Sequence, residues 1–156
     1  MIVKLSICTD SLGHHPFEEM LDKVQELGID IVEMATGGWS PAPHLNLDEL
    51  LESESKRTEF LDALAKRNIT ICALNCSGNP LDPGELGKQH REVTEKTMEL
   101  AGILGVKKVI MMSGLPPATP EDKVPNWITY TVSWPPVLQD YLDYQWNEVA
   151  IPYWES

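Results

Sequence analysis

The sequence predicts an α/β domain whose parallel sheet is built from repeated strand, loop and helix units. Three junctions carry this prediction, because each joins the end of a helix to a β-branched run through a residue that tolerates positive φ. They read LGIDIVEM at 27–34, RNITICAL at 67–74 and LGVKKVIM at 104–111. Their regular spacing indicates an internal repeat. Such alternation favours parallel pairing with right-handed crossovers.

The individual elements follow from periodicity and from residues that start or stop helices. Strands are expected at 2–9, 29–35, 69–74 and 109–112, where short runs are rich in apolar and β-branched residues. Helices are expected at 17–27, from Asn46 or Asp48 through Arg67, at 90–104, and from near Pro136 through Ala150, with Pro152 kinking or breaking the last one. His90 falls on the apolar stripe at the predicted start of the third helix, which suggests a core or capping histidine.

Residues 1–156 are expected to form a single domain of four βα units. Four parallel strands leave two open sheet edges, whereas a closed eight-stranded parallel barrel typically needs about 250 residues. The chain is therefore expected to be either a small open α/β domain or the front half of a barrel.

Composition limits the partners and the cellular location. The net charge is −12, from 24 acidic and 12 basic residues, so nucleic acid and anionic membrane surfaces are not expected partners. The three cysteines suit reduced thiols, and the spacing of Cys72 and Cys76 predicts that both lie on one face of a strand. Neither a signal peptide nor an apolar run of about 18 residues is evident, so a cytoplasmic location is expected.

Candidate functional residues gather where the predicted strands end. In parallel α/β folds, ligands bind at the carboxyl ends of the strands. These ends are the segments 9–15, 35–44, 75–83 and 113–135, all rich in polar, aromatic or glycine residues. The opposite connections are short, so the sequence predicts one functional face.

Glu33 is the most informative of these residues because it lies within an apolar strand. A buried carboxylate is costly unless it is paired or solvated. Glu33 therefore either lines a polar pocket or forms a structural ion pair. Asn75 and Ser77, in the LNCSGNP segment, either bind a polyol or form a turn.

Two further features remain open. The spacing of Asp10, His14, His15 and His44 matches no compact metal motif, so no metal site made by this chain alone is expected. The segment 116–136 is rich in proline and contains Trp127, Tyr130 and Trp134. It is either a lid-like loop over the functional face or a surface that packs against another part of the molecule.

Four segments together resemble a known family: LSICTDSL, IDIVEM, LDALAKRNITICALNCSGNP and REVTEKTMELAGILGVKKVIMMSG. They are similar to the N-terminal half of the xylose-isomerase-like TIM barrel superfamily, the sugar phosphate isomerase/epimerase group. The similarity covers residues 2–114 and continues into WNEVAIPYWES. It implies a complete (β/α)8 barrel, of which this chain would hold a half or truncated form.

The same resemblance implies a function and a cofactor. The family acts on small carbohydrates, and isomerases and epimerases in it remove a proton next to a carbonyl. Their divalent metal (Mn, Zn or Mg) is held by Glu, Asp, His and Glu from strands five to eight, which are expected to lie outside this chain. Whether this chain is an enzyme by itself therefore stays open.

The resemblance carries over the front wall of the pocket. Substrate-binding residues are expected to be Glu33, Asn75 and Ser113 at strand ends, with Trp39 and His44 on the loop that follows the second strand. The WSPAPHLNL and NCSGNP loops also resemble subunits of lyases that cleave oxidised C-glycosides. A further alternative is a non-catalytic half-barrel that forms a homo-oligomer or pairs with a complementary half-barrel chain.

Overall fold

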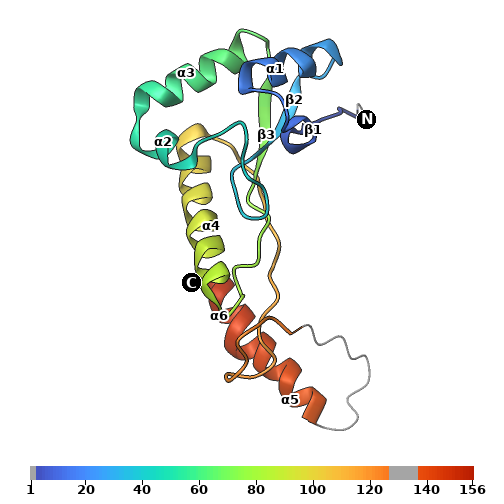
Figure 1. Ribbon diagram of the computed structural model, residues 1–156, viewed down its shortest axis with the longest axis vertical. Coiled ribbons are helices and arrows are strands. Elements are labelled where there is room, and N and C mark those ends of the chain that lie inside the picture. Colours follow the sequence, from blue (N-terminus) through green and yellow to red (C-terminus); the bar gives the residue numbers. More distant parts are fainter. Residues whose placement is uncertain (1–2, 127–136) are drawn as a thin grey trace. The chain divides into compact units, whose positions relative to one another are not determined.

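The computed structural model describes residues 3–126 and 137–156, and its elements follow one another along the chain as coloured in Figure 1. Two compact units are present. The first unit contains residues 1–77 and 93–111, and the second contains 78–92 and 112–156. Within the described ranges, no helix is both long and apolar enough to cross a bilayer. The prediction of a single domain stays a prediction.

The first unit contains a four-stranded parallel sheet in the order β1-β2-β3-β4. The strands are β1 (Ile7–Cys8), β2 (Ile31–Ala35), β3 (Thr70–Asn75) and β4 (Val109–Ile110). Four parallel strands alternating with helices confirm the predicted α/β fold class, as in part of a TIM barrel. The strands predicted at 2–9 and 109–112 are much shorter than expected. Both are edge strands, with a neighbour on one side only in the described chain, so half of their ladder hydrogen bonds are missing.

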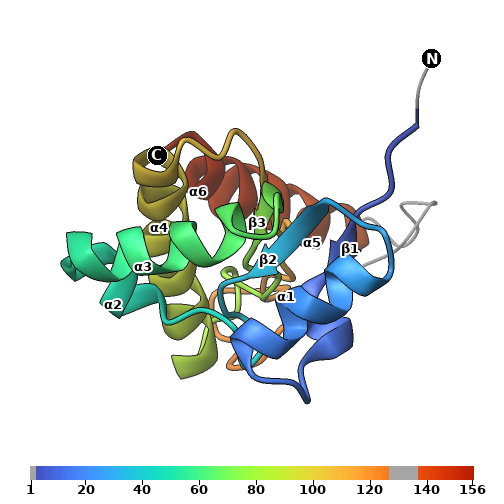
Figure 2. The ribbon, with the colours of Figure 1, turned by 90° about the horizontal axis from the view of Figure 1, so that it is seen from above.

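The helices of this unit are close to those predicted, with two corrections. They are the 3-10 turn η1 (Thr9–Leu12), α1 (Phe17–Glu26), α2 (Leu47–Glu52), α3 (Glu54–Ala65) and α4 (Glu85–Leu104), of which α4 contributes residues to both units. The helical stretch predicted up to Arg67 is divided into the two helices α2 and α3 (Figure 2). The division lies at Ser53, which is extended and caps α3 through its side chain. The helix predicted to start at His90 begins earlier, at Glu85, so His90 lies inside it.

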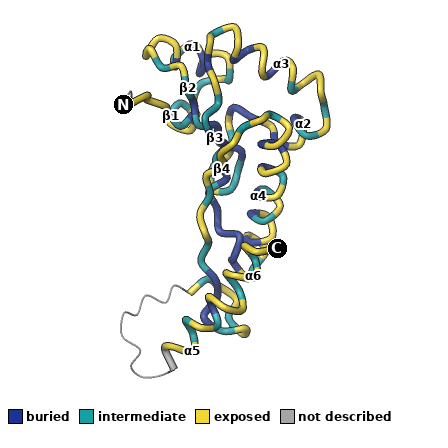
Figure 3. The backbone as a smooth tube through the Cα atoms, turned by 180° about the vertical axis from the view of Figure 1, so that it is seen from behind, coloured by how far each residue is buried: buried dark blue, intermediate teal, exposed yellow. Residues whose placement is uncertain are grey.

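Apolar side chains of the helices and of one sheet face form the core. On α1, Met20, Leu21 and Val24 are fully buried at helical spacing, and Val32 and Met34 of β2 join the same cluster. Burying each of these side chains contributes roughly 1.5–3 kcal/mol. The outer turns of α3 remain exposed, as the yellow tube in Figure 3 shows. This packing fixes one face of the sheet against helices and leaves Glu33 on the other face.

A register shift in β3 determines which of its side chains lie on that other face. Val32 pairs with Ile71 and Glu33 pairs with Ala73, so Cys72 has no partner on β2. Both Ile71 and Leu74 consequently contact the core, although they are three residues apart. The period of two does not hold across this bulge, so the argument that placed Cys72 and Cys76 on one face is wrong.

The second unit contains the last helical region. Its elements are α5 (Val137–Asp143), the π-helix η2 (Tyr144–Ala150) and α6 (Ile151–Glu155). The predicted helix is thus confirmed, but Pro152 does not end it. Pro152 lies in the first turn of α6, where its missing N–H removes no hydrogen bond that an α-helix would need.

Gln145 organises the described part of the proline-rich segment. This buried side chain donates from Nε2 to the carbonyl oxygens of Asn126, at 2.7 Å, and Pro117, at 3.1 Å. The Asn126 N–H donates to the Pro116 carbonyl at 3.1 Å, which closes the loop on itself. Residues 116–126 therefore form an ordered loop around Gln145.

The remaining residues of the proposed lid, with Trp127, Tyr130 and Trp134, lie outside the described residues. The lid-like role of residues 116–136 therefore stays a prediction.

Asn79 and His90 join two loops of the second unit. The Asn79 side chain is buried, accepts the Leu115 N–H at 2.6 Å and donates to the Leu115 carbonyl at 3.1 Å. The Asn79 N–H donates to His90 Nδ1 at 2.7 Å. His90 is thus a buried histidine that anchors the loop after β3.

Candidate functional site

Glu33 and Asn75 form a polar pair on the sheet face opposite the packed helices. The Asn75 amide donates from Nδ2 to Glu33 Oε1 at 2.5 Å. Asn75 Oδ1 accepts the Ser77 N–H at 2.9 Å, so both ends of the amide are fixed. Asn75 is the last residue of β3, whereas Glu33 lies in the middle of β2. β4 follows β3 in the sheet, with Ile110 opposite Asn75.

The partners of Glu33 are neutral groups. Among the ion pairs found in the described residues, none involves Glu33. The structural ion pair considered from the sequence is therefore replaced by an amide partner. A carboxylate that is hydrogen-bonded to a neutral donor still has acceptor positions for a ligand.

Cys8 lies next to Glu33 because these residues are register partners of β1 and β2. Burial raises the pKa of the Cys8 thiol, and the nearby carboxylates of Glu33 and Asp10 raise it further. A hydrogen bond with the Asp10 backbone acts in the opposite direction and lowers this pKa. Cys8 was predicted only to be a reduced thiol, although its position at the end of the first strand would have suggested a place in the site.

We expect the Glu33→Gln substitution to increase the reactivity of Cys8. Glutamine removes a negative charge that raises the pKa of the Cys8 thiol, so the thiolate fraction near pH 8 should increase. The measurement is the iodoacetamide reaction rate against pH, with Cys8 modification followed by peptide mass spectrometry. Glu26→Gln, on the exposed end of α1, is the matched control. An unchanged Cys8 rate in Glu33→Gln would contradict this electrostatic coupling.

Trp39 lies on the loop that follows β2, with 58% of its surface exposed. The backbone N–H of Trp39 donates to the Ser77 carbonyl at 2.7 Å, which ties this loop to the one after β3. Gly38, in front of it, has a φ of +81°, and a Cβ there would meet the Ser77 carbonyl oxygen at 2.2 Å. The indole therefore stands on a closely packed turn that only glycine fits.

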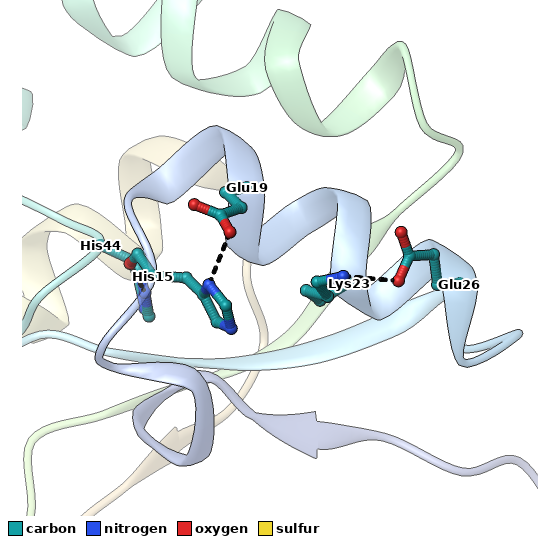
Figure 4. A network of polar contacts seen from close by, with 5 residues as sticks. All are labelled: His15, Glu19, Lys23, Glu26 and His44. Atoms are coloured by element: carbon teal, nitrogen blue, oxygen red, sulfur yellow. Dashed lines mark hydrogen bonds and ion pairs between the residues drawn. The ribbon is translucent and has the colours of Figure 1, made fainter.

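His44 is buried, with 4% of its surface exposed. Its Nε2 lies 3.0 Å from the His15 carbonyl oxygen, and Nδ1 of His15 contacts Glu19 at 2.9 Å (Figure 4). Ser40 donates to Asp10 at 2.8 Å, so a second contact joins the same two loops. His44 therefore holds the loop after β2 against the loop after β1.

Ser113 belongs to the second unit, where its carbonyl accepts the Trp154 indole N–H at 3.0 Å. Of the five predicted substrate-binding residues, the structure brings Glu33 and Asn75 into direct contact. Trp39 joins them through Ser77, whereas His44 packs elsewhere in the same unit. The binding roles of all five stay predictions.

The side chains of the described residues do not fit a divalent metal site. In these parts of the chain, no three carboxylate, histidine or cysteine side chains come together in a way that could hold an ion. Asp10 accepts from Ser40, and Nε2 of His44 contacts a backbone carbonyl, whereas the buried Nδ1 of His44 has no hydrogen-bond partner among the described residues. We therefore derive no step through a metal.

Two buried threonines link the ends of β2 and β3 to α4. Thr36 Oγ1 lies 2.8 Å from Thr97 Oγ1 on α4 and donates to the Asn75 carbonyl at 3.0 Å. Burial raises the pKa of the neighbouring Cys76 thiol, against hydrogen bonds with Thr94 and Thr97 that lower it. Sequence periodicity gave no signal for these contacts, because threonine on an apolar helix face reads as ordinary packing.

The chain with this parallel sheet and these polar strand ends matches a known protein family. Residues 21–138 match the family described as the xylose isomerase-like TIM barrel. The chain belongs to this family. The resemblance stated from the sequence motifs is thereby confirmed, and the fold is that of sugar-modifying enzymes of this type.

Two individual proteins are similar to the chain. Over 154 residues it is 76% identical to the uncharacterized protein YfiH of Bacillus subtilis strain 168, which corresponds to 99% of this chain and 49% of YfiH. The chain therefore spans about half the length of the curated relative it matches. It also resembles the crystal structure of the probable 3-DHS dehydratase AsbF of Bacillus anthracis, with 21% identity and a TM-score of 0.49 over 72% of this chain and 39% of that chain.

Proposed function

We propose that the chain forms the carbohydrate-binding wall of a sugar isomerase or epimerase, in which a proton is removed next to a carbonyl. The observation that carries the proposal is the Glu33–Asn75 pair on the adjoining strands β2 and β3. A carboxylate that is hydrogen-bonded to one amide can still accept hydrogen bonds from sugar hydroxyls, and Glu33 has such acceptor positions. Family membership supports a carbohydrate rather than another polar ligand.

In this proposal Trp39 supplies an apolar surface next to the polar pair. Sugar rings present C–H groups on one face and hydroxyls at their edge, so a site needs both an aromatic plane and acceptors. Trp39 is exposed and its backbone is fixed to the loop that carries Ser77. The metal and the base of the reaction would come from groups that we do not assign to this chain.

Sugar binding tests the proposal directly. We expect D-fructose and D-xylose to give saturation-transfer signals in nuclear magnetic resonance with the whole chain. Glu33→Gln and Trp39→Ala should each weaken binding about tenfold, the loss of one charged hydrogen bond or one stacking surface. Trp146→Ala is the control, because Trp146 is an exposed tryptophan of the second unit. Equal affinities in all four proteins would refute the proposed wall.

The reaction class has its own measurement. Because the metal and the base are not assigned to this chain, the assay uses this chain fused to the part of YfiH that it does not cover. With Mn²⁺, Zn²⁺ or Mg²⁺ added, a ketose bound to this fusion should take up solvent deuterium at the carbon next to its carbonyl. Sugar binding by the fusion without this exchange would favour the second candidate function, a non-catalytic binding module. An oxidised C-glycoside belongs in the same assay, because its cleavage would indicate the lyase alternative instead.

A further inference from the structure

Thr36 follows β2 directly and contacts β3 through both its backbone and its side chain. Its N–H donates to the Asn75 carbonyl at 2.8 Å, and its Oγ1 donates to the same carbonyl at 3.0 Å. A carbonyl oxygen has two lone pairs, so these two hydrogen bonds use the full acceptor capacity of this carbonyl. Thr36 therefore fixes the backbone position from which the Asn75 side chain reaches Glu33.

The contact between Thr36 and Thr97 of α4 has a definite direction. The two Oγ1 atoms lie 2.8 Å apart. A hydroxyl carries one proton and a carbonyl can only accept, so the Thr36 proton is committed to Asn75. In the contact with Thr97, the Thr36 oxygen is consequently the acceptor and Thr97 is the donor. A directed series of hydrogen bonds thus runs from Thr97 through Thr36 to the Asn75 carbonyl.

Gly37 allows α4 to come this close. It has a φ of +145°, and a Cβ at this position would lie 2.8 Å from Cγ1 of Val93. Val93 and Thr97 are four residues apart on α4, so they lie on the same side of the helix. The close approach of Val93 to Gly37 therefore brings Thr97 against the preceding residue, Thr36.

Both threonine hydroxyls are buried, since Thr36 is 3% and Thr97 is 0% exposed. Packing alone would be served equally by valine, which has nearly the shape of threonine and no hydroxyl to remove from water. The hydroxyls contribute instead a fixed direction of hydrogen bonding, which valine cannot supply.

We infer that Thr36, supported by Thr97, positions the Glu33–Asn75 pair for its ligand, an inference that rests on the proposed function. Both threonines act through Asn75, so they are positioning residues. Thr36 holds the Asn75 carbonyl and the Ser77 N–H holds Asn75 Oδ1 at 2.9 Å, which keeps Nδ2 towards Glu33. Loss of the Thr36 hydroxyl should let the Asn75 amide move and leave Glu33 less precisely placed for a sugar hydroxyl.

Substitutions that separate the hydroxyl of Thr36 from its shape test this inference. Thr36→Val keeps the shape without the hydroxyl, whereas Thr36→Ser keeps the hydroxyl. The readout is the Asn75 side-chain amide signal in nitrogen–proton correlation spectra, because a charge-assisted hydrogen bond displaces the signal of the donated proton. Glu33→Gln gives the position of this signal without the carboxylate. Thr36→Val should move the signal towards that position, and Thr36→Ser should leave it at the wild-type value.

Two further variants locate the cause on α4. Thr97→Val removes the donor to Thr36 and should move the Asn75 signal in the same direction by a smaller amount. Thr58→Val is the matched control, because Thr58 is an exposed threonine that donates to the Glu54 carbonyl within α3. It should leave the Asn75 signal unchanged. If Thr36→Val does not fold, an unchanged signal in Thr97→Val would overturn the inference.

Sugar affinity is the second readout. Thr36→Val should weaken the binding of D-fructose or D-xylose about fivefold, and Thr36→Ser should restore it. An Asn75 signal or a sugar affinity that stays at the wild-type value in Thr36→Val would overturn the inference. A Thr36→Ser protein that behaves like Thr36→Val would do so as well. If the wild-type chain binds no sugar, the proposed function fails, and the Asn75 signal alone decides whether Thr36 positions the pair.

Discussion

Replacing Gly38 by alanine is expected to cost about 2–5 kcal/mol of unfolding free energy, which combines left-handed backbone strain with overpacking. The φ of +81° disfavours any side chain, and the new Cβ would meet the carbonyl oxygens of Ser77 and Cys76 at 2.2 and 3.0 Å. The displaced Ser77 would also lose its contact with Asn75. The measurement is urea unfolding followed by circular dichroism.

Two other glycines separate the causes of this loss. Gly102 lies inside α4 with open space around it, so Gly102→Ala should stabilise the chain by about 0.5–1 kcal/mol. Gly28 has a φ of +71° and nothing near its missing Cβ, so Gly28→Ala should cost only the backbone strain, about 1–2 kcal/mol. A Gly38→Ala protein as stable as Gly102→Ala would contradict the close packing of the Trp39 loop.

Replacing Asn79 by alanine is expected to have the second largest effect, about 2–4 kcal/mol. The substitution leaves the N–H and the carbonyl of Leu115 without their partners in a partly buried place. Asn79→Asp should be at least as harmful, because it sets a carboxylate oxygen against the Leu115 carbonyl. Hydrogen exchange at the Leu115 amide, followed by mass spectrometry, reports the loss locally.

Asn147→Ala provides the control for this substitution. Asn147 is an exposed asparagine of the same unit, so its loss should change stability by no more than about 0.5 kcal/mol. Equal protection of the Leu115 amide in Asn79→Ala and in the wild-type chain would show that another contact holds these loops together.

The order of strands and helices could be predicted from local signals. Gly28, Asn68 and Gly105 all have positive φ, as the repeated helix-to-strand junctions indicated. Helix ends and buried apolar runs depend on neighbouring residues, so they can be predicted from the sequence. The lengths of β1 and β4 were not predictable in this way, because the length of a strand depends on pairing with another strand that is distant in the sequence.

The candidate site was predictable in kind but not in detail. A carboxylate in an apolar strand marks Glu33 from the sequence alone, and Asn75 follows from its place at a strand end. The contact between them depends on a register that no local pattern specifies. The contact of the His44 ring with the His15 carbonyl could not be predicted either, because it joins two loops that are far apart in the sequence.

The unpaired residue Cys72 has a consequence for how this sequence can change. Removing Cys72 would make β3 regular, because Ile71 and Ala73 would then be consecutive residues opposite the consecutive residues Val32 and Glu33. Ala73, Leu74 and Asn75 would keep their partners on β2, so Asn75 would stay on the face of Glu33. A deletion at this one position could therefore be tolerated, whereas the loss of Leu74 would move Asn75 to the opposite face of the sheet.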